Sequence, residues 1–125
     1  MGVGGTGVSA VARVYLARGE EVSGCDVKES DVTVALEDAG VRVSIGHDPE
    51  HVLGCDRLVF GRATTRAGAS EIEAGRAMGV EVLSHAEARA AIVSETDSVG
   101  VAGSAGKTTI THMIGTVLAT EGWNP

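Results

Sequence analysis

Apolar positions along the chain alternate between helical and extended spacing. In 8–18 they fall on one helix face, at Val8, Val11, Ala12, Tyr15 and Leu16. The short runs 21–26 and 41–45 instead have the pattern of strands. Between these runs, Ser30 is a candidate N-cap for a helix over 31–39. The first part of the chain therefore predicts a helix, a strand, a helix and a strand.

The same order of elements continues to residue 93. We expect a strand over 58–60, a helix over 70–78, a strand over 80–83 and a helix over 86–93. Strands that alternate with helices through short glycine-containing connections are typical of parallel βαβ units, with helices on both faces of the sheet. The predicted fold class is therefore α/β, a Rossmann-like parallel sheet with flanking helices.

The first glycine loop, 2–7, precedes the first predicted helix and matches the pattern G-x-G-x-x-G. Glycine lets such a loop turn tightly and approach a diphosphate, while the helix N-terminus offers N–H groups to the anion. Asp26 follows at the end of a predicted strand, where an acid commonly binds a ribose hydroxyl. The loop predicts a nucleotide diphosphate, and a tight turn that serves only packing is the alternative.

The second glycine loop, 103–109, is a candidate phosphate loop. Its backbone N–H groups can surround phosphate oxygens, Lys107 can bridge the outer phosphates, and the Thr108 hydroxyl can ligate Mg²⁺. Val101 stands where the strict pattern G-x-x-x-x-G-K-[ST] has glycine, so the general pattern is met only in part. The two loops together predict one ligand with a diphosphate and another with a triphosphate.

A polar break at 94–97 divides the chain into two predicted domains. After the break we expect a buried strand over 98–102, the second glycine loop, and a helix to about Glu121. Residues 1–96 would then form the Rossmann-like domain. Residues 97–125 would form the first strand, P-loop and helix of a truncated ATP-binding central domain.

Both ends of the chain suggest a piece of a longer protein. Only Met1 precedes the first glycine loop, although such a loop normally follows a buried strand. Residues 97–125 are also too few to bury a hydrophobic face of their own. We therefore expect the opening strand to be missing, and we expect 99–102 to fill its place in the sheet.

Composition excludes several classes of function. Seventeen acidic residues against ten Lys and Arg give a net charge of −7, without a basic stripe, so we expect no binding to nucleic acid. No apolar run approaches the ~20 residues that span a bilayer, and no secretory signal opens the chain. We expect a cytoplasmic protein with free thiols at Cys25 and Cys55. The spacing of cysteines and histidines also predicts no zinc site.

Four segments resemble, in order and spacing, the start of a Mur ligase. They are 2–7, 22–26, 45–48 and 101–109. The resemblance implies a cytoplasmic enzyme whose three domains bind a UDP-sugar, ATP with Mg²⁺, and an amino acid. In the member that the chain resembles most, it implies that L-alanine is joined to UDP-N-acetylmuramate through an acyl phosphate, for peptidoglycan synthesis. This chain alone would lack the rest of the catalytic machinery, and no protein partner is implied.

The resemblance also assigns residues by position. The UDP-sugar would be bound by Gly2, Gly4, Gly5, Thr6, Gly7, Asp26 and His47. ATP and Mg²⁺ would be bound by Gly103, Ser104, Ala105, Gly106, Lys107, Thr108 and Thr109. Lys107 would be the catalytic residue, since it stabilises charge on the transferring phosphoryl group, and Thr108 would ligate Mg²⁺. The chain departs from the family pattern at 61–65, 84–87 and 104–105.

Several alternatives stay open. G-x-G-x-x-G with Asp26 also suits an NAD-dependent oxidoreductase, although such an enzyme has no need of the second glycine loop. A non-catalytic nucleotide-binding module is a third possibility. His47 lies in a predicted turn, where its neighbour Asp48 can cap the next helix instead. Arg62 and Arg66 could reach a phosphate, but we expect them to be solvated loop residues.

Overall fold

The computed structural model describes residues 1–64 and 66–123. It divides into two compact units, unit 1 (Met1–Glu95) and unit 2 (Thr96–Pro125). Thr65, which belongs to the departure from the family pattern at 61–65, lies outside the described residues, as do 124–125.

Unit 1 alternates helices and strands as the sequence predicts, with element bounds within a few residues of those expected. Its helices are α1 (Thr6–Ala17), α2 (Asp31–Asp38), α3 (Ala69–Ala77) and α4 (His85–Ser94), and its strands are β1 (Ser23–Asp26), β2 (Arg42–Ile45), β3 (Arg57–Phe60) and β4 (Glu81–Ser84). Two short 3-10 helices, η1 (Pro49–Val52) and η2 (Arg62–Thr64), connect them. The α/β class is confirmed.

Side-chain caps determine where two helices begin. Ser30 caps α2, as predicted: its hydroxyl accepts a hydrogen bond from the Thr33 amide, and the Thr33 hydroxyl accepts one from the Ser30 amide. Ser84 and Glu87 form the same capping box at α4. Each box satisfies N–H groups that the first turn of a helix leaves unpaired.

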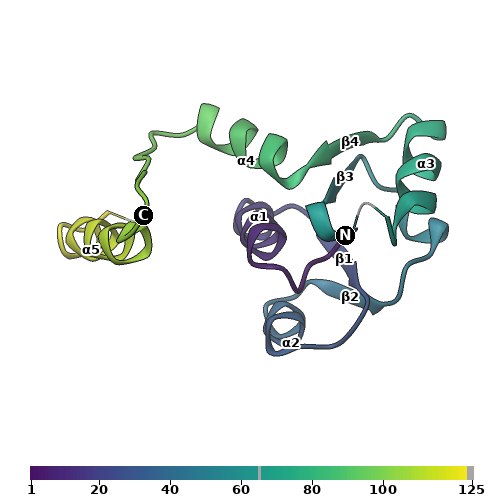
Figure 1. The fold of residues 1–125 in the computed structure, drawn as a ribbon, viewed down its shortest axis with the longest axis horizontal. Coiled ribbons are helices and arrows are strands. Elements are labelled where there is room, and N and C mark those ends of the chain that lie inside the picture. The colour runs from purple at the N-terminus through teal and green to yellow at the C-terminus, as the bar shows by residue number, and fades with distance from the viewer. Residues whose placement is uncertain (65, 124–125) are drawn as a thin grey trace. The chain divides into compact units, whose positions relative to one another are not determined.

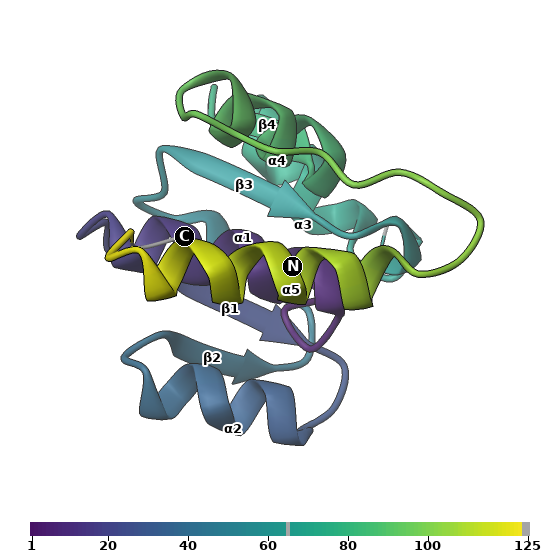
Figure 2. The ribbon, with the colours of Figure 1, turned by 90° about the vertical axis from the view of Figure 1, so that its left-hand side faces the viewer.

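The strands form two parallel pairs instead of the single sheet that we expected. β1 pairs with β2, from Ser23 opposite Arg42 to Asp26 opposite Ile45, and β3 pairs with β4. The arrows of β1, β2 and β3 point the same way in Figure 2. No described strand joins β1 to β3, so the centre of the predicted sheet is open.

Residues 1–3 lie between the two strand pairs. The Met1 ammonium donates to the Val59 carbonyl at 2.7 Å, and the Met1 carbonyl accepts from the Gly61 amide. The amides of Gly2 and Val3 both donate to the Cys25 carbonyl. Next to these residues is a cavity of about 820 Å³, lined by β1, β3 and α1. Residues 1–3 thus lie where a central strand would pair with β1 and β3, but they connect the two only at the carboxyl ends of these strands.

Hydrophobic clusters cover both faces of the strands, as expected. On one face, Val11 and Tyr15 of α1 pack with Ala88 of α4 and with Val59. On the other face, Leu58 packs with residues of α3 and η1. Neighbouring residues of β3 therefore point to opposite faces, as strand geometry requires. Helices α1, α2 and α4 lie on one side of the strands and α3 on the other (Figure 1).

Unit 2 consists of an irregular segment followed by α5 (Lys107–Thr120). The predicted strand over 98–102 is wrong, since these residues have no regular structure and Val99 is 71% exposed. The prediction that 99–102 fills the opening in the sheet is wrong for the same reason. A strand requires backbone partners, and α5 is the only regular element described in unit 2. Without partner strands, the apolar segment 98–102 stays irregular.

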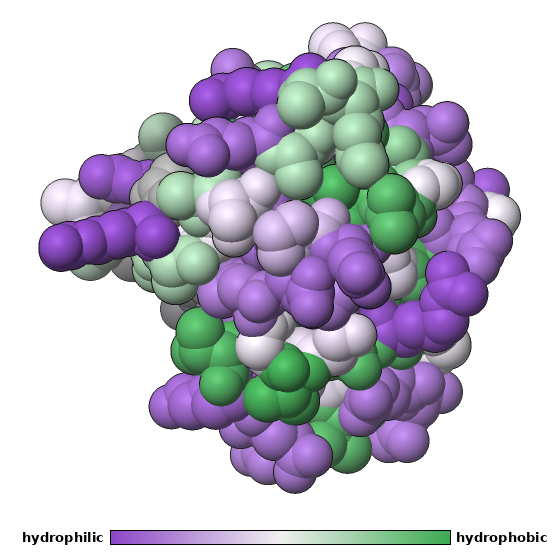
Figure 3. Space-filling model, turned by 90° about the vertical axis from the view of Figure 1, so that its right-hand side faces the viewer, coloured by the Kyte–Doolittle hydropathy of each residue, from purple (hydrophilic) through white to green (hydrophobic). Residues whose placement is uncertain are grey.

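The surface on the α3 side carries small hydrophobic groups separated by hydrophilic ones (Figure 3). Such scattered apolar side chains are normal on a protein surface and do not by themselves mark an interface. None of the described helices combines the length and the apolar composition needed to cross a bilayer.

Candidate functional site

The first glycine loop is held against the end of β1 by backbone and side-chain hydrogen bonds. Gly5 donates its amide to the Gly2 carbonyl, which closes the turn. The Gly4 amide donates to Asp26 Oδ2 at 2.8 Å, and the Val27 amide donates to Asp26 Oδ1. Helix α1 then begins at Thr6 without a side-chain cap. The loop therefore presents the uncapped N-terminus of a twelve-residue helix, which favours an anion.

Three positions in the loop have no room for a larger side chain. A Cβ atom at Gly2, where φ is +74°, would lie 2.6 Å from Thr64 Cγ2. At Gly4 it would lie 2.9 Å from Asp26 Oδ2, and at Gly7 2.8 Å from His85 Cδ2. Each contact is shorter than van der Waals separation, so glycine lets the loop pack closely between its neighbours. Packing therefore gives a second reason for glycine in this loop, besides the close approach of a ligand that the sequence suggested.

A pocket of about 310 Å³ opens beside the loop, at the carboxyl ends of β1, β3 and β4. Its lining includes Gly2, Gly5, Thr6, Gly7 and Asp26 from the predicted site. Gly4 does not line the pocket, but its amide donates a hydrogen bond to Asp26, which does. Ligands of open α/β sheets bind at this edge. The structure therefore brings the glycine loop and Asp26 together around one hollow, and the ligand that they bind stays a prediction.

The far wall of the pocket comes from Arg62, which we expected to be a solvated loop residue, and from Thr64 and His85, which were not assigned from the sequence. Arg62 and Thr64 follow β3, and His85 follows β4. Nδ1 of His85 is buried and has no hydrogen-bond partner among the described residues. Arg66 is exposed and does not line the pocket. The available signal was position, because residues directly after parallel strands meet at the ligand edge.

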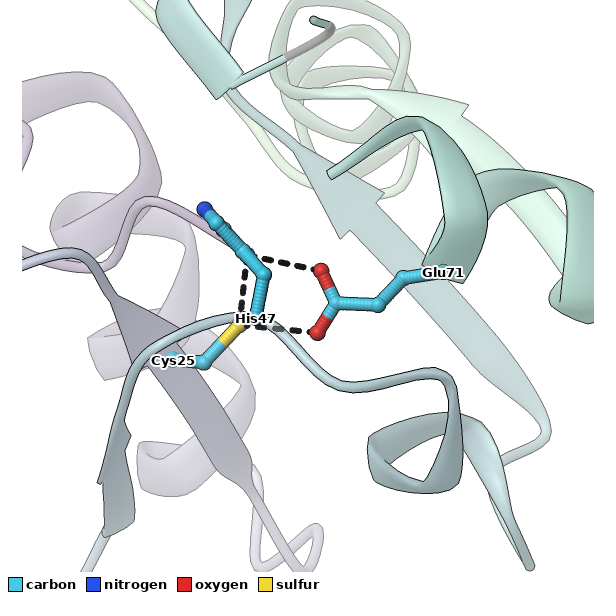
Figure 4. A group of neighbouring side chains, drawn as sticks. All are labelled: Cys25, His47 and Glu71. Atoms are coloured by element: carbon cyan, nitrogen blue, oxygen red, sulfur yellow. Dashed lines mark hydrogen bonds and ion pairs between the residues drawn. The ribbon is translucent and has the colours of Figure 1, made fainter. Parts of the chain in front are cut away.

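His47 lies in a separate cluster on the α3 side of the strands. Its Nδ1 is 2.7 Å from Glu71 Oε2, while the thiol of Cys25 donates to Glu71 Oε1 at 3.3 Å (Figure 4). His51 and the Asp48 amide also bond Glu71 Oε1. His47 is not among the residues that line the pocket beside the first glycine loop. The binding of His47 to a UDP-sugar stays a prediction. Asp48 caps η1, as expected under the alternative in which this turn has a structural role.

Burial and hydrogen bonding set the ionisation of this cluster. Burial raises the pKa of the Glu71 carboxyl, but the hydrogen bonds that it accepts from His51, Cys25, the Asp48 amide and His47 outweigh burial and hold its pKa below the usual value. Burial, with Glu71 alongside, raises the pKa of the Cys25 thiol to about 12. A charged carboxylate and a protonated thiol therefore coexist in a buried environment.

The second glycine loop lies in unit 2 and precedes α5. Gly106 is the N-cap of α5 with φ of 79°, in the left-handed region that glycine adopts at little cost, and no side chain caps the helix. Lys107 Nζ donates to the Gly103 carbonyl at 2.6 Å. The predicted helix after the loop is confirmed, whereas the strand that a phosphate loop normally follows is missing from the described residues. Phosphate binding here stays a prediction.

Comparison with known proteins supports a single family. The profile of the Mur ligase family, catalytic domain, matches residues 1–97. A UDP-N-acetylmuramate--L-alanine ligase of Acidothermus cellulolyticus is 42% identical to the chain over 125 residues. Proteins of the same name from Syntrophobacter fumaroxidans and Persephonella marina are 44% and 35% identical over 126 and 125 residues.

Each of these alignments covers 100% of this chain but only 26% or 27% of the relative. The chain thus spans about a quarter of the length of the curated relatives it matches. The part of this chain that aligns with these three relatives contains both glycine loops.

Proposed function

The chain belongs to the Mur ligase family, and from this premise we propose that it is part of an ATP-dependent ligase that joins L-alanine to UDP-N-acetylmuramate. The names of relatives up to 44% identical, UDP-N-acetylmuramate--L-alanine ligases, support this substrate pair. We further propose that unit 1 binds the UDP-sugar, that the protein acts in the cytoplasm in peptidoglycan precursor synthesis, and that this chain alone does not complete the reaction.

The observation that carries the proposal is the pocket beside the first glycine loop. A diphosphate needs N–H donors and positive charge at its oxygens. The uncapped N-terminus of α1 supplies the donors, and the Arg62 side chain on the opposite wall supplies the charge. Thr6 and His85 add polar groups to the same hollow. We assign the diphosphate of the UDP-sugar to this position, with Asp26 fixing the loop and accepting from the ribose.

The second glycine loop fits a nucleotide triphosphate in its local chemistry. The left-handed Gly106 turns the backbone into α5, whose first-turn amides are uncapped by side chains, and Lys107 folds back over the loop. When bound, ATP supplies the phosphoryl group that activates the substrate carboxylate as an acyl phosphate, and Mg²⁺ neutralises phosphate charge. In this proposal residues 103–109 hold ATP, the Thr108 hydroxyl ligates Mg²⁺, and Lys107 positions the outer phosphates.

A binding measurement with the chain tests the UDP-sugar assignment. Isothermal titration with UDP-N-acetylmuramate and with NAD compares the leading function with the oxidoreductase alternative. We expect the UDP-sugar to bind and Arg62→Ala to weaken it about tenfold to a hundredfold. The reason is that a hydrogen bond to a charged group contributes about 1.5–3 kcal/mol.

Arg76→Ala is the matched control, because Arg76 is an exposed arginine of α3 that does not line the pocket. It removes the same charge from the molecule and should leave the affinity unchanged. Binding of NAD in place of the UDP-sugar would reject the proposed function. An equal loss of affinity in the two arginine variants would reject the placement of the diphosphate.

A further inference from the structure

The buried cluster around Glu71 has the donor set of a transition-metal site. Its members come from different parts of the chain: Cys25 from β1, His47 from the loop after β2, His51 from η1 and Glu71 from α3. Cys25 is 2% exposed and Glu71 is fully buried. Thiolate, imidazole and carboxylate are the three protein ligands that Zn²⁺ prefers.

The donor atoms converge on one small volume. One ligand atom each from Cys25, His47 and Glu71 lies within 4.8 Å of the others. Cys25 Sγ is 3.6 Å from His47 Nδ1 and 3.3 Å from Glu71 Oε1. Metal–ligand bonds of about 2.0–2.3 Å at tetrahedral angles place donor atoms about 3.3–3.6 Å apart. The 2.7 Å contact between His47 Nδ1 and Glu71 Oε2 is shorter than this range, so it must open by roughly half an ångström for Oε2 to share the ion with His47.

The geometry points to a Zn²⁺ site with Cys25, His47 and Glu71 as its protein ligands. Figure 4 shows the other ring nitrogen of His47 directed away from the cluster, so the metal is bound through Nδ1. On binding, the Cys25 thiol releases its proton to solvent, and the His47 proton moves from Nδ1 to Nε2. The two anionic ligands then balance the charge of the ion.

Two further groups hold the carboxylate in place. His51 Nδ1 lies 2.9 Å from Glu71 Oε1, and the Asp48 amide donates to the same oxygen. Hydrogen bonds to a ligand from residues outside the metal's own shell orient it, and their loss typically costs 10- to 100-fold in metal affinity. His51 is therefore a positioning residue in this site.

The cavity between β1 and β3 provides an access route. Cys25 and His51 both line it, and the His51 side chain is 31% exposed. An ion that enters there would connect β1, the loop after β2 and α3, which otherwise meet through hydrogen bonds and apolar contacts. The role of the site is therefore structural, and it does not depend on the proposed function.

Titration of the metal-free chain with Co²⁺, followed by Zn²⁺, tests the site. We expect one equivalent of Co²⁺ to produce a thiolate-to-cobalt absorption band that Zn²⁺ abolishes by displacement. Cys25→Ser should remove the band, whereas Cys55→Ser, which alters the other free cysteine, should keep it. His51→Ala should keep the band but lower the affinity about 10- to 100-fold.

Alkylation of the unaltered chain gives a second measurement in case a variant does not fold. One equivalent of Zn²⁺ should slow the modification of Cys25 and not that of Cys55. The site is refuted if no band forms with one equivalent of Co²⁺, if the band persists in Cys25→Ser, or if Cys55→Ser abolishes it. Equal alkylation of Cys25 with and without Zn²⁺, after a time long enough to modify it in the metal-free chain, would refute it as well.

Discussion

Gly4 connects the local shape of the first glycine loop to its chemistry. Its amide donates to Asp26 Oδ2, and the absence of a side chain lets that carboxylate approach. Gly2 and Gly7 play the same steric part against Thr64 and His85. The three glycines therefore fix the distance between the loop and the walls of the pocket. The pattern G-x-G-x-x-G is a packing requirement here whether or not a ligand is present.

Gly4→Ala should destabilise unit 1 by about 1–3 kcal/mol, because the added methyl would sit 2.9 Å from Asp26 Oδ2 and 3.2 Å from Ser30 Oγ. Urea denaturation monitored by circular dichroism measures the change. Gly100→Ala is the control, since a methyl group there meets no atom within 4 Å. Equal unfolding midpoints for the two variants would contradict the steric account.

Helix α2 shows which properties of a single element are determined by residues that are close in sequence. Ser30 was recognisable as an N-cap because its side chain acts on an amide three residues away, within the same segment. The helix packs through Leu36, which is fully buried, against residues of α1 and β2. Its start is therefore determined locally, and its position is determined by packing.

Ser30→Ala should lower the free energy of unfolding by about 1 kcal/mol, because the Thr33 amide loses its acceptor. Ser30→Asp should stay close to the parent protein, since an aspartate caps a helix about as well as a serine. Chemical denaturation of the three proteins provides the comparison. A similar loss in both variants would mean that Ser30 acts through packing and not through its cap.

At the scale of the whole molecule, the open centre of unit 1 is the main departure from the expected sheet. In the described part, β1 pairs only with β2 and β3 only with β4, so each has an edge toward the cavity that is free except at its carboxyl end, where residues 1–3 are bonded to it. Apolar residues of α1, including Val8, Val11 and Ala12, line that cavity. Free strand edges and apolar walls together make a slot for one more parallel strand.

Four valine or isoleucine residues added ahead of Met1 should raise the free energy of unfolding by about 2 kcal/mol. Burial of apolar side chains in the slot, at about 1.5–3 kcal/mol each, would exceed the cost of ordering the new residues. Amide exchange should slow in β1 and β3. A variant with four glycine and serine residues at the same place is the control, and identical stability of the two would contradict the slot.

Much of unit 1 could be predicted because short-range patterns control it. Hydrophobic spacing marked the four helices and four strands that the structure describes in unit 1, and the first glycine loop with Asp26 marked one side of the pocket. The strand over 98–102 failed, because an apolar run becomes a strand only where partner strands exist. Arg62 was expected to be a solvated loop residue and His85 was not assigned, although both follow parallel strands, whose carboxyl ends meet at the ligand edge.

The sequence by itself determined the α/β class and the helix caps, because each depends on residues close together in the chain. Only the tertiary structure decided that β1 and β3 stay apart, and that Cys25, His47 and Glu71 meet. These three residues are 22 and 24 positions apart, so no local spacing relates them. Contacts of that kind depend on how separate elements pack, and packing is a property of the folded chain.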